Sequence, residues 1–128
     1  MSTASQQHRD EHGKTLADYP RPSIAVDTAV LTVAWDMLWV LLVRSRDGEQ
    51  RLPGTFLHEG ETLERAVRRS LRDKAGVRAS NPQQLHVFDD PRRDDRGWVL
   101  SVAFLDAVPA DRITPSEGTQ LVPVNRLP

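Results

Sequence analysis

The sequence predicts one α/β domain built on a mixed β-sheet, and three observations favour this fold class. The chain has 128 residues, which is enough for one core and too few for two ordinary domains. Runs rich in apolar and β-branched residues alternate with a helical segment in the order strand, strand, helix, strand, strand, strand. The chain also has no internal repeat and no low-complexity core, so we expect a single globular unit.

Two β-rich runs open the domain. Residues 24–35 and 38–46 are separated by Asp36 and Met37, which predicts an antiparallel hairpin, although a bulged turn also fits this spacing. Residues 47–54 contain glycine and proline as breakers and are expected to form a loop. Later strands are expected at residues 83–90, 98–108 and 119–124, with a charged loop at 91–97.

The helical segment is expected at residues 63–75. Thr62 is its predicted N-cap, and Gly76 provides the C-terminal stop. At 100° per residue, Ser70 and Lys74 fall on the same side as the apolar residues of the segment. We therefore expect these two residues to extend the apolar stripe of the helix.

Composition and charge exclude several classes of protein. The net charge of -1 gives no whole-chain support for nucleic-acid binding, and the absence of cysteine excludes disulfides and thiolate zinc sites. The apolar run at residues 38–43 is too short to cross a bilayer, so no membrane partner is expected. We expect a cytoplasmic protein with a polar, flexible tail at residues 1–19 and a domain at residues 20–128.

Residues 55–77 follow a family pattern. Counted from Thr55 without gaps, the pattern G-x5-E-x7-R-E-U-x-E-E-x-G-U, with U a bulky aliphatic residue, is matched at five positions: Glu61, Arg69, Leu71, Gly76 and Val77. This pattern is the box of the Nudix superfamily, which the sequence resembles over roughly residues 19–128. The stretch "FDDPRRDDRGWVLSVAFL" is similar to ADP-ribose pyrophosphatases and to related regulators of NAD biosynthesis.

The resemblance implies the Nudix fold, a mixed β-sheet sandwiched with helices, with a loop-helix-loop box at residues 55–77. It also implies a homodimer. In the family, box glutamates hold Mg²⁺ or Mn²⁺ against a pyrophosphate, because Mg²⁺ requires hard oxygen ligands. Ser70, Asp73 and Lys74 stand at the three acidic positions, so metal binding should be weakened. Asp73 is the remaining candidate metal ligand, and Mg²⁺ or Mn²⁺ is expected as a cofactor only if the protein is active.

The candidate site residues have alternative interpretations. Glu61 and Asp73 would be catalytic in an active enzyme, whereas Glu61 and Arg69 would otherwise form an architectural ion pair. The Lys74 ammonium either replaces the metal and contacts an anionic ligand or extends from the edge of the apolar stripe into solvent. Arg93 and Arg96 either contact a ribose-phosphate or belong to a solvated, self-paired loop. The four candidate ligand-binding residues are Arg69, Lys74, Arg93 and Arg96.

Three functions are consistent with these residues. The first is a degenerate Nudix domain that binds a nucleoside-diphosphate-type ligand resembling ADP-ribose, with impaired or absent hydrolysis. The second is a weak Mg²⁺- or Mn²⁺-dependent hydrolase that uses displaced acids. Those acids would come from Glu59, Glu64, Asp73, Asp89, Asp90 and Glu117. The third is the ligand-sensing part of a regulator of NAD metabolism, in which a C-terminal DNA-binding domain would follow residue 128.

Overall fold

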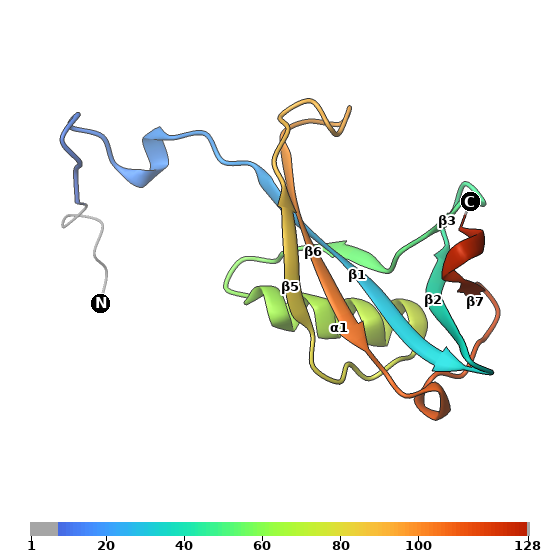
Figure 1. The fold of residues 1–128 in the computed structure, drawn as a ribbon. Helices are drawn as coiled ribbons and strands as arrows, with labels where there is room; N and C mark the ends of the chain where they lie inside the picture. The colour runs from blue at the N-terminus through green and yellow to red at the C-terminus, as the bar shows by residue number, and fades with distance from the viewer. Residues whose placement is uncertain (1–7, 128) are drawn as a thin grey trace.

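A computed structural model describes residues 8–127, which form one mixed β-sheet with an α-helix packed against it (Figure 1). The strands are β1 (Ser23–Ala34), β2 (Met37–Arg44), β3 (Gln50–Arg51), β4 (Gly54–Phe56), β5 (Gln83–Phe88), β6 (Val99–Ala107) and β7 (Thr119–Pro123). Their order is β3-β2-β1-β6-β5, with β4 paired to β1 and β7 paired to β2. Because β1 and β6 are parallel and the other pairs are antiparallel, the sheet is mixed, as predicted.

The hairpin between β1 and β2 is confirmed, with a turn one residue earlier than expected. Trp35 and Asp36 form this turn and both have positive φ, at 51° and 57°. Positive φ at both central residues is the geometry of a two-residue turn that matches the twist of antiparallel strands. The predicted strand at 24–35 therefore loses Trp35, whose side chain is 83% exposed at the tip of the hairpin.

The predicted loop at residues 47–54 was partly wrong, because it contains β3 and the start of β4. β3 pairs with the end of β2, and β4 pairs with residues 25–27 of β1. Gly54 permits the second pairing, since a Cβ on this residue would lie 2.2 Å from Asp27 Oδ1. Tertiary pairing thus imposes short strands on a stretch whose glycine and proline indicate a loop.

Helix α1 (Leu63–Ala75) has the predicted bounds and caps. The Thr62 hydroxyl accepts a hydrogen bond from the Arg65 amide at 3.1 Å, and Gly76 ends the helix with a left-handed φ of 64°. The helix packs on β1 and β4 through Ala66, Val67, Ser70, Leu71 and Ala75, all buried. Burying one Val or Leu side chain contributes about 1.5–3 kcal/mol, so this face holds the helix to the sheet.

Within residues 8–127, α1 is the only α-helix, and three short 3-10 helices complete the fold: η2 (Leu16–Asp18), η3 (Ala110–Arg112) and η4 (Val124–Arg126). The α/β fold class is confirmed, with an α-helix on one face of the sheet where we expected helices on both. Residues 8–19 extend away from the sheet in Figure 1. Since residues 1–7 lie outside the described part, the predicted flexible tail and its boundary at residue 19 stay predictions.

No helix in residues 8–127 is both long and apolar enough to cross a membrane.

Candidate functional site

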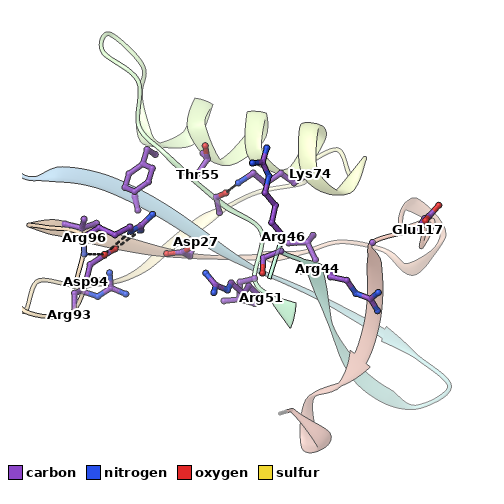
Figure 2. A pocket seen from close by; sticks show the side chains of 18 residues that line it. Asp27, Arg44, Arg46, Arg51, Thr55, Lys74, Arg93, Asp94, Arg96 and Glu117 are labelled. Atoms are coloured by element: carbon purple, nitrogen blue, oxygen red, sulfur yellow. Dashed lines mark hydrogen bonds and ion pairs between the residues drawn. The ribbon is translucent and has the colours of Figure 1, made fainter. Parts of the chain in front are cut away.

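A cleft of about 880 Å³ lies where β1 changes its antiparallel partner (Figure 2). β2 pairs with residues 31–34 of β1, whereas β4 pairs with residues 25–27. The far end of β2 therefore separates from β1, and the cleft lies between Asp27 on β1 and Arg44 on β2. The loops around residues 93–96 and 117–118 complete its walls.

The cleft is lined by more cations than carboxylates. The cationic lining residues are Arg44, Arg46, Arg51, Lys74, Arg93 and Arg96. The acidic lining residues are Asp27, Asp94 and Glu117. Among the described residues, Arg51 pairs with Asp47 and Glu49, and Arg96 pairs with Asp94. Arg44, Arg46, Lys74 and Arg93 have no carboxylate partner within 4.0 Å in residues 8–127. The arrangement favours an anionic ligand.

Lys74 extends from the last turn of α1 into this cleft, where its ammonium donates a hydrogen bond to the Gly54 carbonyl (Figure 2). The side chain is exposed, unlike that of Ser70 one helical turn earlier. The apolar-stripe expectation therefore holds for Ser70 and is wrong for Lys74. An ammonium has three donors, so the contact with Gly54 leaves two for a ligand.

Ser70 and Asp73 occupy the other two acidic positions of the box. Ser70 is 1% exposed, and its hydroxyl has no hydrogen-bond partner among the described residues. The Asp73 carboxylate lies on the helix surface, 3.0 Å from Arg72 Nε, with a side chain that is 55% exposed. Neither residue lines the cleft.

Glu61 and Arg69 form a hydrogen-bonded bracket between the loop before α1, the helix itself and β4. Arg69 donates from Nε and Nη2 to the two oxygens of Glu61, at 2.8 and 3.0 Å. The same guanidinium donates to the Thr55 hydroxyl at 3.2 Å and to the Phe56 carbonyl at 2.9 Å. The Arg69 hydrogen bonds, and then the His58 amide, lower the pKa of Glu61 to about 2. Every Arg69 partner is thus part of the box or β4.

At one end of the cleft, Arg96 lies against an aromatic ring. Its guanidinium carbon is 5.2 Å from the centre of the Phe56 ring. Arg96 also donates to both carboxylate oxygens of Asp94, at 2.9 and 2.7 Å. These bonds hold the pKa of Asp94 well below its usual range. The charged loop is therefore partly self-paired, and this pairing fixes the guanidinium plane at the cleft.

The side chains at Glu61, Ser70 and Lys74 do not match the ligand shell of Mg²⁺ as they are arranged in residues 8–127. Among residues 8–127, no three His, Asp or Glu side chains lie close enough together to hold a metal ion. Both oxygens of Glu61 accept hydrogen bonds from Arg69, and the Lys74 ammonium lies at the Gly54 carbonyl. Mg²⁺ requires a near-octahedral shell of oxygen ligands, so a buried hydroxyl, an ammonium and a bracketed carboxylate do not fit it.

The structure brings together three of the four candidate ligand-binding residues, since Lys74, Arg93 and Arg96 all line the cleft. Glu61, Arg69 and Asp73 do not line it: Arg69 bonds Glu61 to β4, and Asp73 is a 55% exposed side chain of α1. Of the displaced acids considered, only Glu117 lines the cleft. Six further charged or aromatic lining residues were not singled out from the sequence: Asp27, Arg44, Arg46, Arg51, Phe56 and Asp94.

Asp27 could have been singled out from the sequence, because it is the one acid within the apolar strand β1. Its neighbours Val26 and Thr28 are buried beneath α1, so alternation places Asp27 on the other face. Its carboxylate accepts a hydrogen bond from the Ser101 hydroxyl at 2.6 Å. The pairing with Ser101 crosses from β1 to β6, which sequence alone does not reveal.

The family model of the NUDIX domain matches residues 25–128. The chain therefore belongs to the Nudix family. This assignment agrees with the mixed sheet, the box helix at residues 63–75 and the bracket between Glu61 and Arg69.

Three individual proteins are similar to this chain within the Nudix family. The chain is 34% identical over 90 residues to an ADP-ribose pyrophosphatase from Methanocaldococcus jannaschii, covering 68% of this chain and 52% of that protein. It is 31% identical over 94 residues to the ADPR responsive transcriptional repressor NtrR from Acinetobacter baylyi, covering 69% of this chain and 38% of the repressor. The chain thus spans about half, or less, of the length of these two relatives.

The third relative is a solved structure. The NUDIX domain of Shewanella oneidensis NrtR, determined as a cocrystal with ADP ribose, superposes with a TM-score of 0.76 at 25% identity. The match covers 98% of this chain and 85% of that domain. Relatives of this chain therefore include proteins that bind ADP-ribose.

Proposed function

We propose that this Nudix domain binds a nucleoside-diphosphate-type ligand resembling ADP-ribose without a divalent metal, and that its pyrophosphate hydrolysis is impaired or absent. The contact of the Lys74 ammonium with the Gly54 carbonyl is the observation that carries this proposal. It puts a fixed positive charge in the cleft from a box position where an active family member has an acid. Lysine binds phosphate as a point charge in other proteins, so the ammonium can take over charge neutralisation.

The surrounding charges support the same ligand class. Arg44 and Arg46 have no carboxylate within 4.0 Å in the described residues and share the cleft with Lys74. In Figure 2, Arg46 extends toward α1, on the same side of the cleft as Lys74. Two or three cations converging on one space match the charge of a diphosphate. The names of the relatives point to ADP-ribose as the first ligand to test.

Turnover is tested by incubating the purified protein with ADP-ribose, with Mg²⁺, with Mn²⁺ or with a chelator, and measuring AMP by chromatography. We expect no AMP above the protein-free rate in any condition. Steady metal-dependent formation of AMP would contradict the hydrolytic part of the proposal. Binding is tested separately, so that loss of turnover and loss of recognition are distinguished.

A reconstruction tests the part that two box positions play in metal binding. In the Ser70→Glu/Lys74→Glu variant, two acids join Asp73 on the helix, and the first substitution puts a carboxylate where the serine is 1% exposed. A buried, unpaired carboxylate is unfavourable, so we expect a lower Tm without metal and a clear increase in Tm with Mg²⁺. The matched Ser70→Gln/Lys74→Gln variant should show no response. Absence of a Mg²⁺ response in the glutamate variant would refute the assignment of these positions as lost metal ligands.

A second candidate function is weak Mg²⁺- or Mn²⁺-dependent hydrolysis with displaced acids. The observation that favours it is the presence of Asp27 and Glu117 in the lining of the cleft. Such an enzyme should release AMP from ADP-ribose, and Asp27→Asn or Glu117→Gln should abolish the release. Asp73→Ala should have no effect, because Asp73 lies outside the cleft.

The biological setting is also a proposal. One relative is named as an ADPR responsive transcriptional repressor, so the domain is a candidate ligand-sensing module of such a regulator. We further propose a homodimer and a cytoplasmic location, as expected from the family resemblance and the absence of cysteine. Analytical ultracentrifugation tests the dimer directly, and a sedimentation coefficient of a 14.4 kDa monomer at micromolar concentration would contradict it.

A further inference from the structure

Phe56 and Arg96 present a flat cationic surface at one end of the cleft. The guanidinium lies over the aromatic ring, with 5.2 Å between its carbon and the ring centre. The Arg96 side chain is 68% exposed although it contacts Phe56 and Asp94, so much of it is accessible to a ligand. Both residues line the cleft (Figure 2). A ligand that enters the cleft can therefore reach a planar surface as well as the cations.

This surface is held in place from both sides. Asp94 binds two nitrogens of Arg96, and the Asp94 side chain is only 13% exposed. On the other side, β4 pairs Phe56 with Ala25, and Arg69 donates to the Phe56 carbonyl at 2.9 Å. The bracket between Glu61 and Arg69 thus positions an element of the cleft as well as the box loop. A guanidinium fixed by two hydrogen bonds loses little further freedom when a ligand stacks on it.

We infer that the base of a nucleotide stacks on the open face of the Arg96 guanidinium, whose other face rests on Phe56; this inference rests on the proposed function. Bases stack on aromatic side chains and on arginine planes because every base has a flat π-face. The Arg96 charge is already balanced by Asp94, whereas Lys74 has no carboxylate partner in residues 8–127. The uncharged base therefore suits the Arg96 end, and the diphosphate suits the Lys74 side.

The inference predicts that the base and the diphosphate contribute separately to affinity. Titration of ADP and of inorganic pyrophosphate into the protein without metal measures these two contributions. ADP should bind at least about fivefold more tightly than pyrophosphate, given the usual strength of base stacking. Arg96→Lys keeps the charge but removes the plane, and Phe56→Leu removes the ring beneath it. Both should weaken ADP at least about threefold and leave pyrophosphate within about twofold.

Phe88→Leu is the matched control, because Phe88 is a 48% exposed phenylalanine on β5 outside the cleft. It should change neither affinity, and circular dichroism checks that each variant is folded. Equal affinities of wild-type protein for ADP and pyrophosphate would overturn the stacking inference and leave the anion site intact. An equal loss for both ligands in Arg96→Lys would also overturn it, because that variant would then act on the phosphates. Failure of both ligands to bind wild-type protein would refute the proposed function itself.

Discussion

The two halves of the box differ in what their side chains do. In the first half, Glu61 and Arg69 form a bracket of four hydrogen bonds that ties the loop and β4 to α1. In the second half, Ser70 is a buried hydroxyl without a partner in the described residues, and Lys74 is an ammonium directed at the Gly54 carbonyl. The halves meet at neighbouring residues of the helix, yet Glu61 and Arg69 match the family pattern whereas Ser70 and Lys74 do not.

This difference shows that the hydrogen bonds that tie the box loop and β4 to α1 involve neither Ser70 nor Lys74. The bracket positions Thr55 and Phe56 without any metal, because its partners are protein donors and acceptors. Ser70 and Lys74 stand where the family pattern has acids. Ser70 is buried and Lys74 lines the cleft, and neither residue belongs to the bracket. The proposed change from a cation site to an anion site would therefore leave the bracket of Glu61 and Arg69 intact.

The largest expected effect is on the affinity for ADP-ribose when the charge of Lys74 is reversed. Lys74→Glu should weaken ADP-ribose binding at least about a hundredfold, because one attraction of roughly 4 kcal/mol at an effective dielectric of about 20 becomes a repulsion. Isothermal titration measures the change. Arg72→Glu, which reverses a charge on the same helical turn outside the cleft, is the control and should leave affinity within about threefold. Similar losses in both variants would mean that only the overall charge matters.

Gly54→Ala should disturb both the contact with Lys74 and the pairing of β4 with β1. Gly54 accepts the Lys74 hydrogen bond and is the first residue of β4. The new Cβ would lie 2.2 Å from Asp27 Oδ1 and 3.0 Å from the Val26 carbonyl. We expect a loss of about 1–3 kcal/mol in the free energy of unfolding, as for other overpacked sites. Urea denaturation measures it. Adding Asp27→Ala removes the nearest contact and should recover part of the loss, whereas no recovery would place the strain in the backbone.

A smaller effect is expected at the start of the helix. Thr62→Ala removes the hydroxyl that accepts from the Arg65 amide and should lower the free energy of unfolding by about 1 kcal/mol. Thr62→Ser should keep most of the stability. Neither variant should change the affinity for ADP-ribose, because Thr62 lies outside the cleft. A parallel loss of affinity would show that the two halves are coupled.

The last expected effect depends on pH and concerns Glu61→Gln, which keeps the shape of the bracket and removes its charge. Since the Arg69 hydrogen bonds lower the pKa of Glu61 from 4.5 to about 2, this carboxylate stabilises the fold above pH 4.5. That contribution is lost as the pH falls from about 4.5 to 2. The Tm of wild-type protein should therefore fall more steeply than that of Glu61→Gln in this range. Identical pH profiles would contradict the bracket.

Local signals in the sequence predicted the helix and the main strands. Thr62, Gly76 and the apolar period between them predicted α1 at its observed bounds, because caps and periodicity depend on neighbouring residues. The short strands β3 and β4 were missed, since their pairing partners lie on β2 and β1 rather than nearby in sequence. Gly48, Pro53 and Gly54 indicate a loop here, yet the two strands of two and three residues fit between or begin at them.

Only part of the candidate site was predicted, because pairing between distant strands brings the rest of its residues together. The box spacing singled out Lys74, and the charged loop singled out Arg93 and Arg96, all of which line the cleft. Arg44 and Arg46 were not singled out, because only the separation of β2 from β1 brings them to the cleft. Trp35, the last residue of the strand expected at 24–35, lies in the turn and is 83% exposed, since the turn begins one residue earlier than expected.

Metal-independent recognition is tested most directly by isothermal titration of ADP-ribose into the wild-type protein with Mg²⁺ and with EDTA, assaying the same samples for AMP. We expect the same affinity in both conditions and no AMP, because Lys74 and the cleft arginines supply the positive charge. Binding that requires Mg²⁺, accompanied by AMP, would show that acids outside the box hold a metal in this cleft, and the role assigned to Lys74 would be wrong.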